Sequence, residues 1–122
     1  MQFYSKSCTL HNIAFCPGVD FDTTDCHAMG WGKDAFGDAD GYQEYNQFLR
    51  SVQLQIVDHD TCQEGLRSTR LRDDFELDPS FVCAGGGEDG RDVCEGDGGG
   101  PLVCKAKRGE NFILAGIGKL KF

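Results

Sequence analysis

The sequence predicts an all-β protein organised as a small antiparallel β-barrel. Its 122 residues include 17 glycines, which suit a chain with many turns, and 39% of the residues are hydrophobic. A chain of this length can bury roughly two thirds of its unfolded surface, so one modest core is feasible. Long stretches with helical periodicity are nearly absent, whereas residues 48–57 alternate apolar and polar side chains as a half-buried strand does.

The first half of the chain predicts a linker followed by two strands. Residues 1–25 show no clear period and are expected to form the linker. Residues 27–32 are expected to be a short strand, with a polar turn at residues 37–41 after it. The second strand, residues 48–57, has the clearest pattern, because polar side chains separate its apolar ones: Phe48, Val52, Leu54 and Ile56.

A short helix is expected next, followed by three more strands. Asp58 or Asp60 can cap the helix, and Thr61 with Glu64 has the spacing of a capping box. Gly65 weakens the helix and limits it to two or three turns. The remaining strand candidates are residues 81–85, 101–105 and 112–117.

Acidic side chains dominate the charge of the protein. Lys and Arg number 12 against 20 Asp and Glu, which gives a formal net charge of -8. The acids cluster at residues 34–44, 73–78 and 88–97. Such a surface repels nucleic acid, so no nucleic-acid partner is expected. A solvated acidic face that keeps the protein soluble explains the charge better than a dedicated site for a basic partner.

The cysteine content indicates an extracellular protein. Seven cysteines in so short a chain are typical of an oxidising compartment. Residues 1–15 lack the continuous apolar run of a signal peptide, so the beginning of the chain is expected to be missing. No stretch reaches the ~20 apolar residues of a membrane span, and no membrane association is expected.

Three segments partly match ligand-binding motifs, and each departs from its motif. A zinc site at Cys26 and His27 lacks Cys-x-x-Cys or His-x-x-x-His spacing. Residues 85–90 fit Gly-x-Gly-x-x-Gly, but acids beside a pyrophosphate would oppose its binding. Residues 36–47 resemble a calcium loop whose first ligand position holds phenylalanine. No metal ion or cofactor is therefore expected.

One segment near the end of the chain resembles the active-site loop of a known enzyme family. Residues 94–104 contain Gly-Asp-Gly-Gly-Gly-Pro, similar to the Gly-Asp-Ser-Gly-Gly-Pro of trypsin-like serine proteases, with Gly98 in place of the nucleophilic serine. Other segments resemble that family in the same order: residues 26–32, 54–62, 81–85 and 111–117. A narrower resemblance is to the arthropod serine protease homologues, masquerade-like proteins that include the prophenoloxidase-activating factors. It rests on residues 31–37, 61–71 and 96–99.

The resemblance implies the second, C-terminal barrel of a trypsin-like fold, incomplete at its C-terminal end. Residues 1–25 correspond to the inter-barrel linker and a remnant of the first barrel, and residues 26–122 to the partial second barrel. The family's final strand and C-terminal helix are absent. The strand at residues 112–117 is therefore expected to leave an exposed edge, which promotes association.

The resemblance also implies a disulfide framework. It pairs Cys26 with Cys104 and Cys62 with Cys83. In the family, the partner of Cys94 lies beyond the strand that ends at residue 117, where this sequence diverges, so Cys94 is expected to lack its partner. The cysteines that stay unpaired or uncertain are Cys8, Cys16 and Cys94.

A protein without proteolytic activity follows from the same resemblance. Glycine has no atom that attacks a carbonyl, and residues 81–122 contain no serine, threonine or tyrosine to replace it. None of the three histidines has the Ala-Ala-His-Cys context of the catalytic histidine: His11, His27 and His59. The histidine and its aspartate would belong to an absent first barrel, so a serine restored at position 98 would still lack a triad.

Four positions correspond to remnants of the family's site. The amides of Gly96 and Gly98 match the oxyanion hole, which has little catalytic value without a nucleophile. Asp97 matches the aspartate that receives a freed N-terminus, and it is expected to be a solvated or hydrogen-bonded carboxylate here. Asp92 matches the acid that reads a basic substrate side chain. An idle loop residue is favoured there over a site for a partner's arginine or lysine.

The leading function is that of an inactive serine protease homologue, secreted into haemolymph, that acts as a binding cofactor in an innate-immune cascade of the prophenoloxidase type. Its expected partner is a protease, a phenoloxidase or a microbial surface. The alternatives are an active trypsin-like serine endopeptidase and a truncated product without function. Covalent labelling by a fluorophosphonate separates the first two, and a cooperative urea transition under oxidising conditions excludes the third.

Overall fold

The structure, a computed structural model, describes residues 2–4, 20–33, 45–86, 93 and 97–119. Its strands are β1 (Gln2–Tyr4), β2 (Phe21–Gly30), β3 (Arg50–Val57), β4 (Phe81–Gly85), β5 (Pro101–Ala106) and β6 (Phe112–Lys119). Between β3 and β4 lie the helix α1 (His59–Leu66) and a short π-helical segment η1 (Arg67–Leu71).

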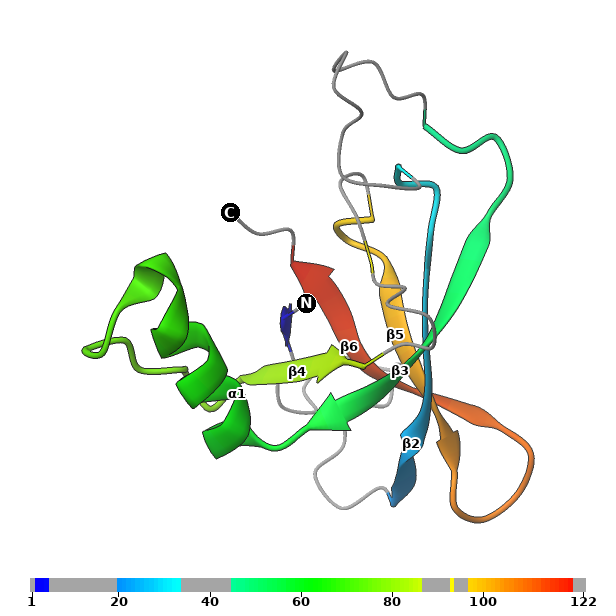
Figure 1. The fold of residues 1–122 in the computed structure, drawn as a ribbon. Helices are drawn as coiled ribbons and strands as arrows, with labels where there is room; N and C mark the ends of the chain where they lie inside the picture. Colours follow the sequence, from blue (N-terminus) through cyan, green and yellow to red (C-terminus); the bar gives the residue numbers. More distant parts are fainter. Residues whose placement is uncertain (1, 5–19, 34–44, 87–92, 94–96, 120–122) are drawn as a thin grey trace.

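The strands form a closed antiparallel barrel in the order β1-β4-β3-β2-β5-β6. Figure 1 shows β2 and β3 as one long pair, β1 beside β4 and β6, and α1 outside the barrel at the end of β3. The expected all-β antiparallel barrel is therefore confirmed. The strands expected at residues 81–85, 101–105 and 112–117 are β4, β5 and β6, and β3 lies within the strand expected at residues 48–57.

The core is built from alternate positions of the central strands. Its most buried side chains come from β2, β3 and β5: Cys26, Ala28, Leu54, Leu102 and Cys104. The register sets Cys26 opposite Leu54 of β3 on one side and opposite Cys104 of β5 on the other. Side chains directly opposite one another share a face of the sheet, so all three point into the barrel.

Two disulfides tie the fold together. One joins Cys26 of β2 to Cys104 of β5 across the core, and the other joins Cys62 of α1 to Cys83 of β4. These are the pairs that the resemblance implies. The remaining cysteines lie outside the described residues: Cys8, Cys16 and Cys94.

Strand β2 begins earlier than the sequence predicts. The expected strand covers residues 27–32, whereas β2 starts at Phe21, and its register to β5 shifts between Phe21 and Cys26. A register shift, as at a β-bulge, lets a strand continue through residues that do not alternate. Residues 21–25 therefore escape a search for strict alternation.

Among the described strands, the edge of β6 away from β5 is paired only at residues 117–119, so the exposed edge expected along residues 112–117 is covered at Ile117 alone. β1 pairs with β6 along one side and with β4 along the other, and so closes the barrel. A strand of three residues has no period of its own, and its neighbours in the fold decide whether it forms. This is why the aperiodic start of the chain gave no sign of a strand.

Helix α1 begins at an N-cap that the sequence leaves open between two aspartates. Asp58 has an extended backbone, and its Oδ1 accepts a hydrogen bond from the Thr61 N–H at 3.0 Å. Asp60 lies inside the first turn instead. Asp58 is therefore the cap, because its carboxylate satisfies an N–H that the helix leaves unpaired.

Asp58→Ala is expected to lower the melting temperature more at neutral pH than at pH 2. Hydrogen bonds from the Thr61 hydroxyl and N–H lower the pKa of Asp58 below its ordinary value of 3.8. Such a carboxyl stabilises the fold above its unfolded pKa, and the contribution disappears as the pH falls through the folded pKa. Asp60→Ala removes the same charge without the cap and serves as the control. A wild-type minus Asp58→Ala difference that stays constant from pH 7 to pH 2 would contradict this cap.

Side chains of α1 and η1 hold the loop that leads into β4. The His59 Nε2–H donates to the Leu77 carbonyl at 2.9 Å, and Gln63 Oε1 accepts from the Leu77 N–H at 2.9 Å. The Arg67 Nε–H donates to the Phe75 carbonyl at 2.8 Å. Leu77 is buried. His59 therefore has a structural role in anchoring this loop.

Candidate functional site

The residues that correspond to a protease active-site loop form a tight turn just before β5. The Gly100 N–H donates to the Asp97 carbonyl at 3.0 Å, which closes a four-residue turn. Gly99 has a φ of 82°, in the left-handed region that residues with a side chain disfavour. Gly98 is exposed at the tip of the turn. The backbone thus presents position 98 to solvent.

The turn is held from two sides of the barrel. On β6, the Gly99 N–H donates to the Gly118 carbonyl, and the Gly118 N–H donates to the Gly100 carbonyl, both at 2.8 Å. Beyond the end of β2, the Gly32 N–H donates to Asp97 Oδ1 at 2.7 Å. A side-chain contact and two main-chain hydrogen bonds therefore fix the turn.

Small residues permit this close approach. A Cβ added to Gly32 would lie 2.5 Å from Asp97 Oδ1, and one added to Gly30 would collide with the same carboxylate. A Cβ on Gly100 would lie 2.5 Å from the Met29 carbonyl oxygen. Sequence reasoning matched residues 26–32, which end in Gly30-Trp31-Gly32, to the family but missed their contact with Asp97. Two glycines flanking one tryptophan were the available signal.

The described histidines are engaged elsewhere. His27 Nε2 lies 3.0 Å from Asp25 Oδ1, two residues along β2, and the His27 ring meets the Phe112 ring edge-on with centroids 5.7 Å apart. His59 is bound to Leu77. His11 lies outside the described residues. At position 98 the turn carries a glycine, so it offers backbone groups and the Asp97 carboxylate but no nucleophile.

Two of the predicted site positions are brought together. Asp97 and Gly98 belong to the same turn, and Asp97 is a hydrogen-bonded carboxylate, one of the two states that the sequence leaves open. The other predicted positions lie outside the described residues: Asp92, Gly96 and Cys94.

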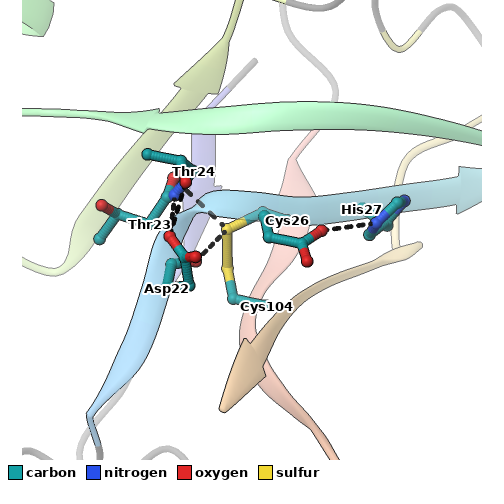
Figure 2. Close-up of polar contacts among 7 residues, drawn as sticks. Asp22, Thr23, Thr24, Cys26, His27 and Cys104 are labelled. Atoms are coloured by element: carbon teal, nitrogen blue, oxygen red, sulfur yellow. Dashed lines mark hydrogen bonds and ion pairs between the residues drawn. A yellow bond between two sulfur atoms is a disulfide. The ribbon is translucent and has the colours of Figure 1, made fainter. Parts of the chain in front are cut away.

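A second polar cluster stands beside the core disulfide at the start of β2 (Figure 2). Asp22 Oδ1 accepts hydrogen bonds from the Thr24 hydroxyl at 2.7 Å and the Thr24 N–H at 2.9 Å. These bonds lower the pKa of Asp22. Cys26 Sγ lies 3.5 Å from the Asp22 carbonyl oxygen, so this local turn covers the disulfide. The nearby Asp20–Lys107 pair, at 2.7 Å, raises the pKa of Lys107.

The described residues give no sign of a metal site. They contain no group of three or more histidine, cysteine, aspartate or glutamate side chains placed to hold a metal ion. Cys26 is committed to a disulfide, so it is no thiolate ligand for zinc. In the same part of the chain, none of the helices has the length and apolar content to cross a membrane.

In the part of the chain that the structure describes, four large apolar side chains are exposed around the end of β2 and the segment that leads into β3. We call them the Trp31 surface: Trp31 (56% exposed), Tyr45 (56%), Phe48 (77%) and Leu49 (50%). The Asn46 side-chain amide donates to the Gly32 carbonyl at 2.6 Å, and Lys33 Nζ lies 5.5 Å from the centroid of the Tyr45 ring. Tyr45 and Asn46 therefore lie beside the end of β2, next to Gly32, whose N–H donates to Asp97.

Comparison with known proteins supports the motif-based resemblance. A model of the trypsin family matches residues 16–120. Phenoloxidase-activating factor 2 of Galleria mellonella is 56% identical over 95 residues, which cover 77% of this chain and 30% of that protein. Inactive CLIP domain-containing serine protease A3 of Aedes aegypti is 41% identical over 105 residues, 85% of this chain and 21% of that protein. Coagulation factor XII of Cavia porcellus is 36% identical over 102 residues, which cover 83% of this chain and 15% of that protein.

The chain spans less than a third of the length of each of these curated relatives. The family match nevertheless covers β2 to β6, the turn at residues 97–100 and all four cysteines of the two disulfides. The suspected resemblance is thereby confirmed: the chain belongs to the trypsin family.

Proposed function

We propose that this protein is a catalytically inactive serine protease homologue that binds partner proteins in an extracellular cascade of the prophenoloxidase type. The observation that carries the proposal is Gly98 at the tip of a fully formed turn. The backbone hydrogen bonds of the turn are present, while the atom that would attack a peptide bond is missing. One relative is named a phenoloxidase-activating factor and another an inactive serine protease, which supports both halves of the proposal.

Catalysis needs more than the nucleophile, and the described residues around the turn supply no replacement. A serine protease transfers the serine proton to a histidine that an aspartate orients. The described histidines serve other partners, since His27 lies beside Asp25 and Phe112 and His59 binds the Leu77 carbonyl. The turn is therefore retained as a structural element of the barrel.

The Trp31 surface is the proposed contact for a partner protein. Exposed apolar clusters rimmed by polar residues mark protein interfaces, and aromatic side chains often carry most of the binding energy. A protease or a phenoloxidase is the proposed partner. The prediction that Asp92 reads a basic side chain stays open, because this residue lies outside the described residues.

The test combines active-site labelling with a cascade assay on one sample. Neither the wild-type chain nor Gly98→Ser is expected to react with a fluorophosphonate, because no described histidine stands ready as a base. Active trypsin is the positive control. Added to prophenoloxidase and its activating protease, the wild-type chain is expected to raise phenoloxidase activity. Labelling of the purified wild-type chain would overturn the inactive assignment.

The same assay tests the Trp31 surface with two variants of that surface and one control variant elsewhere on the barrel. Trp31→Ser and Phe48→Ser are expected to reduce the stimulation at least tenfold, about the effect of losing 1.4 kcal/mol of binding. Phe112→Ser is the control, since Phe112 is 52% exposed but lies on β6, at the strand end away from Gly118 and the turn. Equal loss in all three variants would remove the Trp31 surface from the proposal and leave the inactive assignment standing.

A further inference from the structure

The position between β4 and β6 in the barrel is filled by β1, a strand of only three residues. In the described sheet, β4 pairs with β3 along one of its edges, and β6 pairs with β5 along one of its edges. β1 pairs with the other edge of β4 and with the other edge of β6. β4 and β6 do not pair with each other. Without β1, two rows of main-chain N–H and C=O groups would lose their partners, which is costly wherever water cannot replace them.

Main-chain groups define this gap. β1 runs antiparallel to both neighbours, in the rows Gln2↔Cys83 and Lys119, Phe3↔Val82 and Gly118, and Tyr4↔Phe81 and Ile117. Recognition of an added strand through main-chain hydrogen bonds depends on an extended backbone in the correct direction far more than on its side chains. The gap between β4 and β6 is thus a ready acceptor for a short antiparallel strand.

A side-chain contact crosses the gap on one face. Lys119 Nζ of β6 lies 5.3 Å from the centroid of the Phe81 ring of β4. These strands stand two strand spacings apart, roughly 10 Å, with β1 between them. The contact between Lys119 and Phe81 therefore passes across β1. It would pass in the same way across any other strand bound between β4 and β6. Lys119 is exposed and Phe81 is half-buried, so the closure can open without breaking the core.

The connection between β1 and β2 is long enough for exchange. Sixteen residues, 5–20, separate Tyr4 from Phe21. A chain of that length spans at most about 55 Å when extended. A domain of this size is about 35 Å across. A strand on such a tether reaches the same gap in a neighbouring molecule.

We propose that the gap between β4 and β6 is a binding site for a strand supplied in trans, and that its occupant is residues 2–4 of a second copy of this chain. Each molecule would complete the barrel of the other in a closed two-fold dimer. Exchange costs little because every β1 contact is replaced by an identical one. The tether keeps the chain's own β1 at an effective concentration of millimolar order, so the dimer becomes populated near about 1 mM protein.

Paramagnetic broadening tests this exchange with the full chain. Wild-type protein labelled with ¹⁵N is mixed with unlabelled protein that carries a nitroxide on the α-amino group of Met1. At about 1 mM total protein, the amide signals of Val82 and Gly118 in the labelled chain are expected to broaden. The amides of Lys105 and Phe112, which pair at the end of β5 and β6 away from Lys119, are expected to remain sharp. Their sharpness separates exchange from random collisions. Sharp signals at Val82 and Gly118 at this concentration would overturn the proposal.

A variant of the donor chain provides the control. Phe3→Pro in the nitroxide-bearing chain removes a main-chain donor and fixes φ near -65°, so its β1 pairs poorly in the gap. The receiving chain stays wild-type, so its folding does not depend on the variant. Broadening is expected to fall at least fivefold with this donor. Equal broadening by both donors would also overturn the proposal.

Discussion

Replacing Cys26 and Cys104 together by alanine is expected to lower the free energy of unfolding by roughly 4.5 kcal/mol, the chain-entropy value for a loop closed by residues 78 positions apart. Typical domains are stable by only about 5–15 kcal/mol. Both side chains are 0% exposed, so alanine also removes buried sulfur from the core. Urea unfolding monitored by circular dichroism measures the loss.

The second disulfide supplies the comparison. Cys62 and Cys83 are 21 positions apart, which corresponds to roughly 3.3 kcal/mol in the same treatment. This bridge attaches α1 to β4 at the barrel's periphery, and Cys83 is 7% exposed. The double alanine variant of this pair is therefore expected to be less destabilised. A larger loss from removing Cys62–Cys83 would contradict the central role assigned to the Cys26–Cys104 bridge.

Gly100→Ala is expected to destabilise the protein by about 1–3 kcal/mol, the usual cost of forcing an extra carbon into a packed site. The new Cβ would lie 2.5 Å from the Met29 carbonyl oxygen and 2.9 Å from the Asp97 carbonyl oxygen. Both obstacles are backbone atoms, so relief requires the turn to move away from β2. The Asp97–Gly32 hydrogen bond would lengthen with it. Urea unfolding gives the energy, and the Gly32 amide chemical shift reports the displacement.

Gly65→Ala is the matched control for the same chemical change. Gly65 lies in α1, and a Cβ added there meets nothing within 4 Å. Alanine is the better helix former by about 0.8–1 kcal/mol, so this variant is expected to be more stable than the wild type. Opposite signs at the two sites would separate the helix preference of alanine at Gly65 from the steric contact at Gly100. Destabilisation at both positions would show that the close contact at Gly100 does not determine the effect.

The barrel was largely predictable because its central strands carry their pattern locally. The alternation around Leu54 reports a strand with one buried face, and β3 is such a strand. β1 gave no signal, since its three residues owe their conformation to β4 and β6, which are distant in sequence. The first half of β2 was hidden by the register shift after Phe21. What escaped prediction is structure imposed by non-local pairing.

In the candidate site, too, the features carried by local sequence were predictable and those that depend on distant contacts were not. Gly98 was evident from one residue type in a recognised loop, because a missing nucleophile can be read directly from the sequence. The contact between Asp97 and Gly32 was not, since 65 positions separate the two residues. The Trp31 surface was also missed. Whether an apolar side chain is exposed depends on which segments of the fold pack against it, and a local sequence pattern does not show this.

The pairing of β1 with β6 also bears on how the protein is made. Residues 2–4 and 117–119 stand side by side although nearly the whole chain separates them. Contacts between such distant residues carry a large entropy of loop closure and favour slow folding. During synthesis, the barrel cannot close until residue 119 has emerged from the ribosome. In that interval its unpaired strand edges are prone to aggregation.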